Sequence, residues 1–260
     1  MTRDSTMTNA VRFVAIGDSF TEGVGDPRPD GTVRGWADLV AQGWAAARGE
    51  AISYANLAIR GRLIWQIVEE QLEPALALKP THLSFVGGGN DMLRPGRTVE
   101  HVADAFSKVL QRCDEEGVKL IVHSGANPSA RLPMSRFIQR RGSQLADAVE
   151  ARVADRPDVF RALHWFDKEL ASAGYWAEDR LHMNAWGHHR VAARVLAAVG
   201  IDAPQEWWSL PTGVDVPILG QAAYYWTHAL PWFHRRLTGR SSGDGRVSKL
   251  RTWITVNPNS

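Results

Sequence analysis

Short apolar runs rich in β-branched residues alternate with longer segments of helical periodicity between residues 11 and 200. This alternation is typical of repeated βα units, which build a parallel sheet covered by helices. The pattern predicts strands over Val11–Ile16, Ala51–Ala55, His82–Val86, Lys119–His123 and Ala162–Phe166. It predicts helices over Trp36–Arg48, Leu63–Leu78, Val99–Glu116, Arg136–Val153 and Ala185–Val199. We therefore expect one α/β domain with a central parallel sheet over residues 11–200.

The remaining segments lack such a pattern. Residues 1–10 are mostly polar and are expected to be flexible or disordered. Residues 201–260 show no sustained period of 2 or 3.6, which predicts an irregular C-terminal extension, rich in Trp and Arg, that packs on the main domain. Its tryptophans are Trp207, Trp208, Trp226, Trp232 and Trp253. A less favoured alternative is a membrane-surface or acyl-chain contact, with Arg235, Arg236 and Arg240 meeting phosphates.

Composition narrows the class of protein. With 44% hydrophobic and 22% charged residues, the chain has the profile of a globular protein. Thirty basic against 28 acidic residues leave a net charge of +2, which argues against nucleic acid as a partner. The single cysteine, Cys113, excludes an intrachain disulfide. Because we find no export signal and no apolar span free of Pro and Gly, we expect a cytoplasmic protein. Its oligomeric state is left open.

The first predicted strand runs directly into Gly17-Asp18-Ser19-Phe20-Thr21-Glu22-Gly23. Open α/β sheets bind their ligands beyond the carboxyl ends of the strands, which is where Ser19 falls. Gly17 permits a tight turn, and the residues after Ser19 could open a helix whose N–H groups favour a developing negative charge. Asp18 and Ser19 could equally serve only as helix caps. On its own the motif leaves both readings open.

A serine nucleophile needs a base and a group that orients this base. Asp179-Arg180-Leu181-His182 places a carboxylate and an imidazole three residues apart, just before the last predicted helix. One short turn can present both side chains to one pocket, where Asp179 would fix the tautomer of His182. Taken alone, such a pair is usually found at the surface. Combined with Ser19, it predicts a catalytic arrangement.

Donors for an oxyanion are the third requirement. After the third strand, Gly87-Gly88-Gly89-Asn90-Asp91 offers the side-chain amide of Asn90, and after the second strand Gly61 offers a backbone N–H. A glycine run could also be a flexible turn. A phosphate loop is excluded, because neither Gly-Lys-Ser/Thr nor Gly-x-Gly-x-x-Gly is present.

These four blocks, in this order, resemble the SGNH or GDSL-type hydrolase family, over about Val11 to Gly200. The resemblance implies a three-layer α/β/α domain of flavodoxin-like type that needs no metal or other cofactor. It also implies Ser19 as nucleophile, Asp179 and His182 as its partners, and Ser19, Gly61 and Asn90 as the oxyanion hole. The Asn-Leu-Ala-x-Arg-Gly second block is most similar to actinobacterial-type members, whereas Phe20 replaces a more usual leucine.

The resemblance implies hydrolysis of carboxylic esters with short to medium acyl chains through an acyl-enzyme on Ser19. The expected partner is a small-molecule or acylated substrate. One alternative is an O-acetyl esterase that acts on a carbohydrate or cell-envelope precursor. Another is a non-catalytic module that binds a lipid or a partner. The candidate pocket residues are Trp36, Trp65, Met92, Trp176 and Met183, although helical spacing favours core packing for each of them.

Two further patterns are interpreted as incidental. Gly239-Arg240-Ser241-Ser242-Gly243 fits the Gly-x-Ser-x-Gly elbow of α/β-hydrolases, but it follows no predicted strand and no histidine comes after it. His188 and His189 lack a metal-ligand spacing and are expected to pack or to face solvent.

Overall fold

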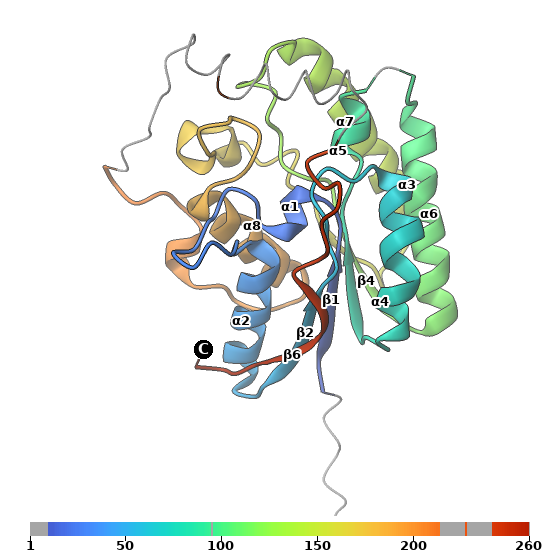
Figure 1. Ribbon diagram of the computed structural model, residues 1–260, viewed down its shortest axis with the longest axis vertical. Helices are drawn as coiled ribbons and strands as arrows, with labels where there is room; N and C mark the ends of the chain where they lie inside the picture. The colour runs from blue at the N-terminus through green and yellow to red at the C-terminus, as the bar shows by residue number, and fades with distance from the viewer. Residues whose placement is uncertain (1–9, 95, 214–226, 228–240, 260) are drawn as a thin grey trace, which may run out of the picture.

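The computed structural model describes residues 10–94, 96–213, 227 and 241–259, and within them six strands form one sheet (Figure 1). The strands are β1 (Arg12–Ile16), β2 (Ile52–Asn56), β3 (His82–Phe85), β4 (Lys119–His123), β5 (Phe160–Ala162) and β6 (Leu250–Val256). Their order is β5-β4-β3-β1-β2-β6, and only β6 is antiparallel to its neighbour. The five parallel strands follow the flavodoxin-like order 2-1-3-4-5. The predicted α/β fold is confirmed.

Helices cover both faces of this sheet (Figure 1). One face carries α2 (Trp36–Arg48) and α8 (Ala185–Ala198), which pack against each other. The other face carries α3 (Ile64–Ile67), the π-helical stretch η1 (Val68–Leu72), α4 (Glu73–Ala77), α6 (Val99–Glu116) and α7 (Ser135–Val153). Short elements at loops are α1 (Ser19–Glu22), α5 (Gly89–Met92), η2 (Glu169–Ala171), η3 (Ala173–Tyr175) and η4 (Gln205–Trp207). The result is a three-layer domain.

The strands read as continuous apolar runs because both faces of the sheet are buried. In β1, Val14 and Ile16 join the apolar cluster under α6, whereas Phe13 and Ala15 join the cluster under α2 and α8. All four side chains are fully buried. This strand, which leads to Ser19, is therefore anchored from both sides.

The predicted helix over Leu63–Leu78 is present from Ile64 to Ala77 but is not a uniform α-helix. Its middle part, η1, is π-helical and is followed by α4, in which Pro74 is the second residue. Proline has no N–H to donate to the preceding turn, and a wider π-turn accommodates the missing bond. Gln71 lies in this π-helical stretch.

The fifth strand lies earlier than the predicted Ala162–Phe166. It spans Phe160–Ala162, and Ala162 pairs with His123 of β4. After Ala162 the chain leaves the sheet, because His164 is buried against His123 and Trp165 packs against α7. The apolar residues that suggested a strand thus fill the space beyond its carboxyl end.

The prediction of an irregular extension is wrong for Leu250–Val256, which form β6 along the free edge of β2. Trp253 of this strand lies against Arg12 and donates its Nε1–H to the carbonyl oxygen of Leu78. Trp207 is half-buried and packs on the cluster under α2 and α8. Further predictions concern residues outside the described part of the chain, namely residues 1–9, Trp226, Trp232, Arg235, Arg236 and Arg240. In the described part of the chain, no helix has the length and apolar character needed to span a membrane.

Candidate active site

Ser19 begins α1, directly beyond the carboxyl end of β1. Asp18 caps this helix, since its Oδ1 accepts a hydrogen bond from the N–H of Phe20 at 3.1 Å. Gly17 has no room for a side chain, because a β carbon there would lie 2.3 Å from Oγ1 of Thr21. The predicted turn and helix after the strand are thus both present, and Ser19 faces the end of the sheet.

Gln71 is a supporting residue that the sequence analysis missed. Its side chain, projected from the π-helical stretch, accepts a hydrogen bond from Gly17 N–H at 2.8 Å and donates one to the carbonyl oxygen of Gly17 at 3.0 Å. Both groups are buried, so leaving them unpaired would be costly. Gln71 therefore fixes the backbone two residues before Ser19. No periodic pattern signals a side chain-to-backbone bond of this kind.

His182 and Asp179 lie where the Asp-x-x-His spacing predicts. His182 Nε2 is 3.1 Å from Ser19 Oγ, although the two residues are 163 positions apart, and His182 Nδ1 is 2.5 Å from Asp179 Oδ2. Asp179 Oδ1 also accepts the N–H groups of Leu181 and His182. Arg180 has a left-handed conformation with φ 61°, which turns the loop so that both side chains converge.

Burial raises the pKa of Asp179, but hydrogen bonds from His182 and the charge of its imidazolium form outweigh burial, so the pKa of Asp179 lies well below its usual range. Asp179 is therefore a carboxylate at neutral pH. A carboxylate at Nδ1 holds the imidazole in the tautomer whose Nε2 is free to accept the proton of Ser19.

Asn90 is in α5, beyond the end of β3, and its amide points to the site. Its Nδ2 lies 3.3 Å from Asp18 Oδ2 and donates to the carbonyl oxygen of Arg62 at 3.1 Å. The neighbouring Asp91 accepts the N–H of Ile64, at the start of α3. The Gly-x-Asn-Asp block thus joins the loop after β2 to the turn that carries Ser19.

Gly61 is in this loop after β2, with a left-handed φ of 76°, but it is not part of the lining of the pocket next to Ser19. It lies instead against residues 241–249, the part of the chain before β6 that is called the C-terminal segment below. A β carbon on Gly61 would be 2.2 Å from Ser241 Oγ in this segment. The structure therefore brings Ser19, Asp179, His182 and Asn90 together directly. Gly61 is linked to them through Arg62 and Asn90.

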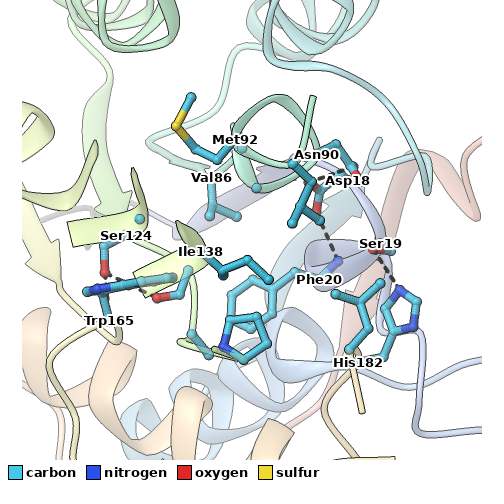
Figure 2. A pocket seen from close by; sticks show the side chains of 18 of the residues that line it. Asp18, Ser19, Phe20, Val86, Asn90, Met92, Ser124, Ile138, Trp165 and His182 are labelled. Atoms are coloured by element: carbon cyan, nitrogen blue, oxygen red, sulfur yellow. Dashed lines mark hydrogen bonds between the residues drawn. The ribbon is translucent and has the colours of Figure 1, made fainter. Parts of the chain in front are cut away.

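A cavity of about 130 Å³ opens next to Ser19 and His182 (Figure 2). Figure 2 shows these two residues at one end and Trp165 with Ser124 at the other, with Phe20 and Ile138 between them. Apolar side chains predominate in the wall, which also includes Met92, Leu145, Trp176 and Met183. Three of the five candidate pocket residues, Met92, Trp176 and Met183, line the cavity, where core packing was the favoured expectation.

The other two predicted pocket residues are elsewhere. Trp36 is fully buried beside the His123 ring, and Trp65 donates its Nε1–H to the carbonyl oxygen of His101 on the face covered by α6. Both tryptophans follow helical spacing, which cannot distinguish core positions from pocket positions. His188 is also buried, and His189 bonds its own helix. Among the described residues, no three His, Cys, Asp or Glu side chains are grouped to hold a metal ion.

A Ser–His–Asp chain at the strand ends of a three-layer α/β domain is the arrangement of a serine hydrolase. The chain belongs to the GDSL-like lipase/acylhydrolase family, whose model matches residues 15–190. It is therefore a hydrolase that acts on esters. The predicted actinobacterial-type branch stays a prediction.

Several known proteins are similar to this chain at low sequence identity. The uncharacterized protein YpmR of Bacillus subtilis (strain 168) is 25% identical over an alignment of 211 residues, and the match covers 72% of this chain and 80% of that protein. A catalytic mutant of Axe2, an acetylxylan esterase from Geobacillus stearothermophilus, has a TM-score of 0.63 at 18% identity, covering 77% of this chain and 97% of that one. The lipase Lip_vut3 from a goat rumen metagenome also has a TM-score of 0.63 at 18% identity, covering 74% and 99%.

Proposed function

We propose that this protein hydrolyses carboxylic esters with short to medium acyl chains through an acyl-enzyme on Ser19. The observation that carries this proposal is the hydrogen-bonded chain from Ser19 through His182 to Asp179, placed at one end of an apolar cavity. A hydroxyl next to an oriented imidazole is the arrangement that acyl transfer to serine requires.

In the proposed mechanism, His182 Nε2 removes the proton of Ser19 while Oγ attacks the ester carbonyl carbon. Asp179 stabilises the resulting imidazolium. The carbonyl oxygen becomes an oxyanion, which is assigned to the N–H groups of Ser19 and Gly61 and the amide of Asn90. His182 then gives its proton to the alkoxide, the alcohol leaves, and Ser19 remains acylated. Water, deprotonated by the same imidazole, hydrolyses the acyl-enzyme and restores Ser19.

The test of this proposal is covalent capture of the nucleophile. Incubation with an alkyl fluorophosphonate should release fluoride and leave one phosphonyl group on the peptide that contains Ser19, as measured by mass spectrometry. Hydrolysis of p-nitrophenyl butanoate should disappear in parallel with labelling. Labelling at another serine, or a wild-type protein that neither reacts nor hydrolyses esters, would contradict the proposal and favour a binding module.

The cavity sets the expected chain length. Its volume of about 130 Å³ is near that of an apolar cavity that accommodates benzene. We therefore expect kcat/KM for p-nitrophenyl esters to be highest for acyl chains of about four to six carbons. A clear preference for acetylated sugars over these esters would favour the O-acetyl esterase alternative.

Trp165 closes the cavity opposite Ser19, held by bonds from its backbone N–H to Ser124 Oγ and from Nε1 to Ser143 Oγ. The substitution Trp165→Ala removes this wall, so the optimum is expected to move to longer acyl chains, measured as kcat/KM across the same ester series. Trp65→Ala is the matched control, because Trp65 is half-buried and also donates its Nε1–H to a hydrogen bond but lies outside the cavity. An unchanged optimum in Trp165→Ala would place the acyl chain elsewhere.

A further inference from the structure

The C-terminal segment contacts two carbonyl groups of the loop that carries Gly61, those of Arg60 and Gly61. Ser241 Oγ donates a hydrogen bond to the carbonyl oxygen of Gly61 at 3.2 Å. Gly243 lies against the carbonyl oxygen of Arg60, so closely that a β carbon there would be 2.0 Å from it. The carbonyl of Arg60 and the N–H of Gly61 belong to the same planar peptide group. A contact that fixes this carbonyl therefore also fixes the direction of the Gly61 N–H.

The contacting part of the segment is a hydrogen-bonded turn. Ser241 N–H donates to Asp244 Oδ2 at 2.8 Å, and Gly243 N–H donates to Ser241 Oγ at 3.1 Å. A third bond joins Asp244 N–H to the carbonyl oxygen of Ser241. Gly243 is buried within this turn. The turn can thus act on the Arg60–Gly61 peptide as a fixed support.

Lys249 ties the same segment to the helix that begins at Ser19. Its Nζ donates to the carbonyl oxygens of Glu22 and Val33 at 2.7 and 3.1 Å and to Asp38 Oδ2 at 2.6 Å. In Figure 1 the segment, drawn in red, continues from β6 along the edge of the sheet to the level of α1. Because β6 is paired with β2, the segment starts from a fixed position.

Glu22, the last residue of α1, connects this helix to the loop that carries Gly61. Its carboxylate accepts the backbone N–H of Arg60 at 2.7 Å and the Nε–H of the same residue at 2.9 Å. Helix α1, the loop that carries Gly61 and the C-terminal segment are therefore each hydrogen-bonded to the other two. The three parts are far apart in sequence, with Lys249 and Glu22 separated by 227 positions.

We infer that Ser241, Gly243 and Lys249 are positioning residues of the active site, which orient the Arg60–Gly61 peptide so that its N–H faces the oxyanion formed at Ser19. This inference rests on the proposed function, because it takes Gly61 as an oxyanion donor. Removing one such donor typically lowers kcat by about 10²- to 10³-fold, and a displacement of about 1 Å can cost about 10²-fold. Small displacements of the C-terminal segment should therefore lower kcat measurably.

Gly243→Ala in the full-length chain is the sharpest test. The φ of Gly243 is not in the left-handed region, so alanine is tolerated by the backbone itself and acts through its contact with Arg60. We expect kcat for p-nitrophenyl butanoate to fall by about 100-fold with little change in KM. The inhibition constant of a boronic acid, whose tetrahedral Ser19 adduct presents an oxygen to the same donors, should rise by a similar factor. A structural defect alone would not separate kcat from KM in this way.

Ser241→Ala is the second variant, with Ser242→Ala as its matched control. Ser241→Ala removes the bond to Gly61 and should lower kcat by about tenfold, whereas Ser242 is exposed, donates no side-chain hydrogen bond among the described residues, and should leave kcat unchanged.

The outcomes distinguish the two proposals. If the wild type hydrolyses esters and both Gly243→Ala and Ser241→Ala keep its kcat, the positioning role is overturned while the proposed function stands. If Gly243→Ala does not fold, an unchanged kcat in Ser241→Ala overturns the inference by itself. A wild type without esterase activity overturns both proposals.

Discussion

Substitution of Ser19 by alanine is expected to lower kcat for ester hydrolysis by about 10⁶-fold, to the level that binding and oxyanion donors supply without a nucleophile. His182→Ala should cause a loss of similar size, because it removes the imidazole that lies within hydrogen-bond distance of Ser19 Oγ. The double variant should be little worse than either single one, since the two groups act as a unit.

Steady-state kinetics of these three variants with p-nitrophenyl butanoate is the measurement, with thermal melting to show that each is folded. His101→Ala is the control, because His101 is half-buried on α6 and lies outside the cavity. If Ser19→Ala kept substantial activity, the nucleophile would be another residue.

Asp179→Asn separates orientation from proton transfer in the same chain. The substitution preserves the size of the side chain but removes the carboxylate that accepts His182 Nδ1–H, so the imidazole favours the wrong tautomer. We expect a loss of about 10⁴-fold in kcat at neutral pH. An effect smaller than about tenfold, on the scale of one neutral hydrogen bond, would mean that Asp179 does not orient His182.

Much of the site could be predicted because of one property of parallel sheets. The carboxyl ends of the strands meet at one edge, so chemically active residues just after separate strands converge there. Ser19 after β1 and Asn90 after β3 could be assigned in this way, and His182 joins them from the loop before α8. The apolar runs located the strands because both faces of the sheet are buried.

The parts that could not be predicted depend on contacts without a periodic pattern. β6 lies at the edge of the sheet and is partly exposed on both faces, so its residues do not alternate cleanly. Its β-branched content, with Thr252, Ile254 and Val256, was the one available signal. The bond from Ser241 to Gly61 joins positions 180 residues apart through a side chain and a backbone oxygen. Such a bond becomes visible only once the fold is known.

Mild acid is expected to destabilise the folded protein strongly between pH 7 and 5, because several histidines are buried in the neutral form. Burial lowers the pKa of His123 to about 3 and those of His82 and His188 to about 4, and it holds the pKa of His164 well below its ordinary value. The geometry agrees, since His123 Nδ1 and His164 Nε2 are 3.1 Å apart and share one hydrogen.

The free energy of unfolding changes with pH because the folded and unfolded states bind different numbers of protons. Below about pH 6.5 the unfolded chain protonates these histidines and the folded protein does not, so the free energy of unfolding falls as the pH falls. Each histidine contributes up to about 1.4 kcal/mol per pH unit between pH 6.5 and its folded pKa. Asp18 acts in the opposite direction, because burial raises its pKa to about 6 and the folded state retains that proton. Burial also raises the pKa of Asp91, and these two carboxyl groups offset only part of the effect of four histidines.

Urea unfolding at pH 7, 6 and 5 should therefore give a steadily lower free energy of unfolding, with a loss of several kcal/mol at pH 5. Ordinary carboxylates scarcely titrate in this range, so the slope reports the histidines. His123→Leu should reduce the slope by about the share of one histidine, because it removes one of the buried groups that the unfolded chain protonates. A free energy of unfolding independent of pH over this window would show that the buried pair accepts protons in the folded state.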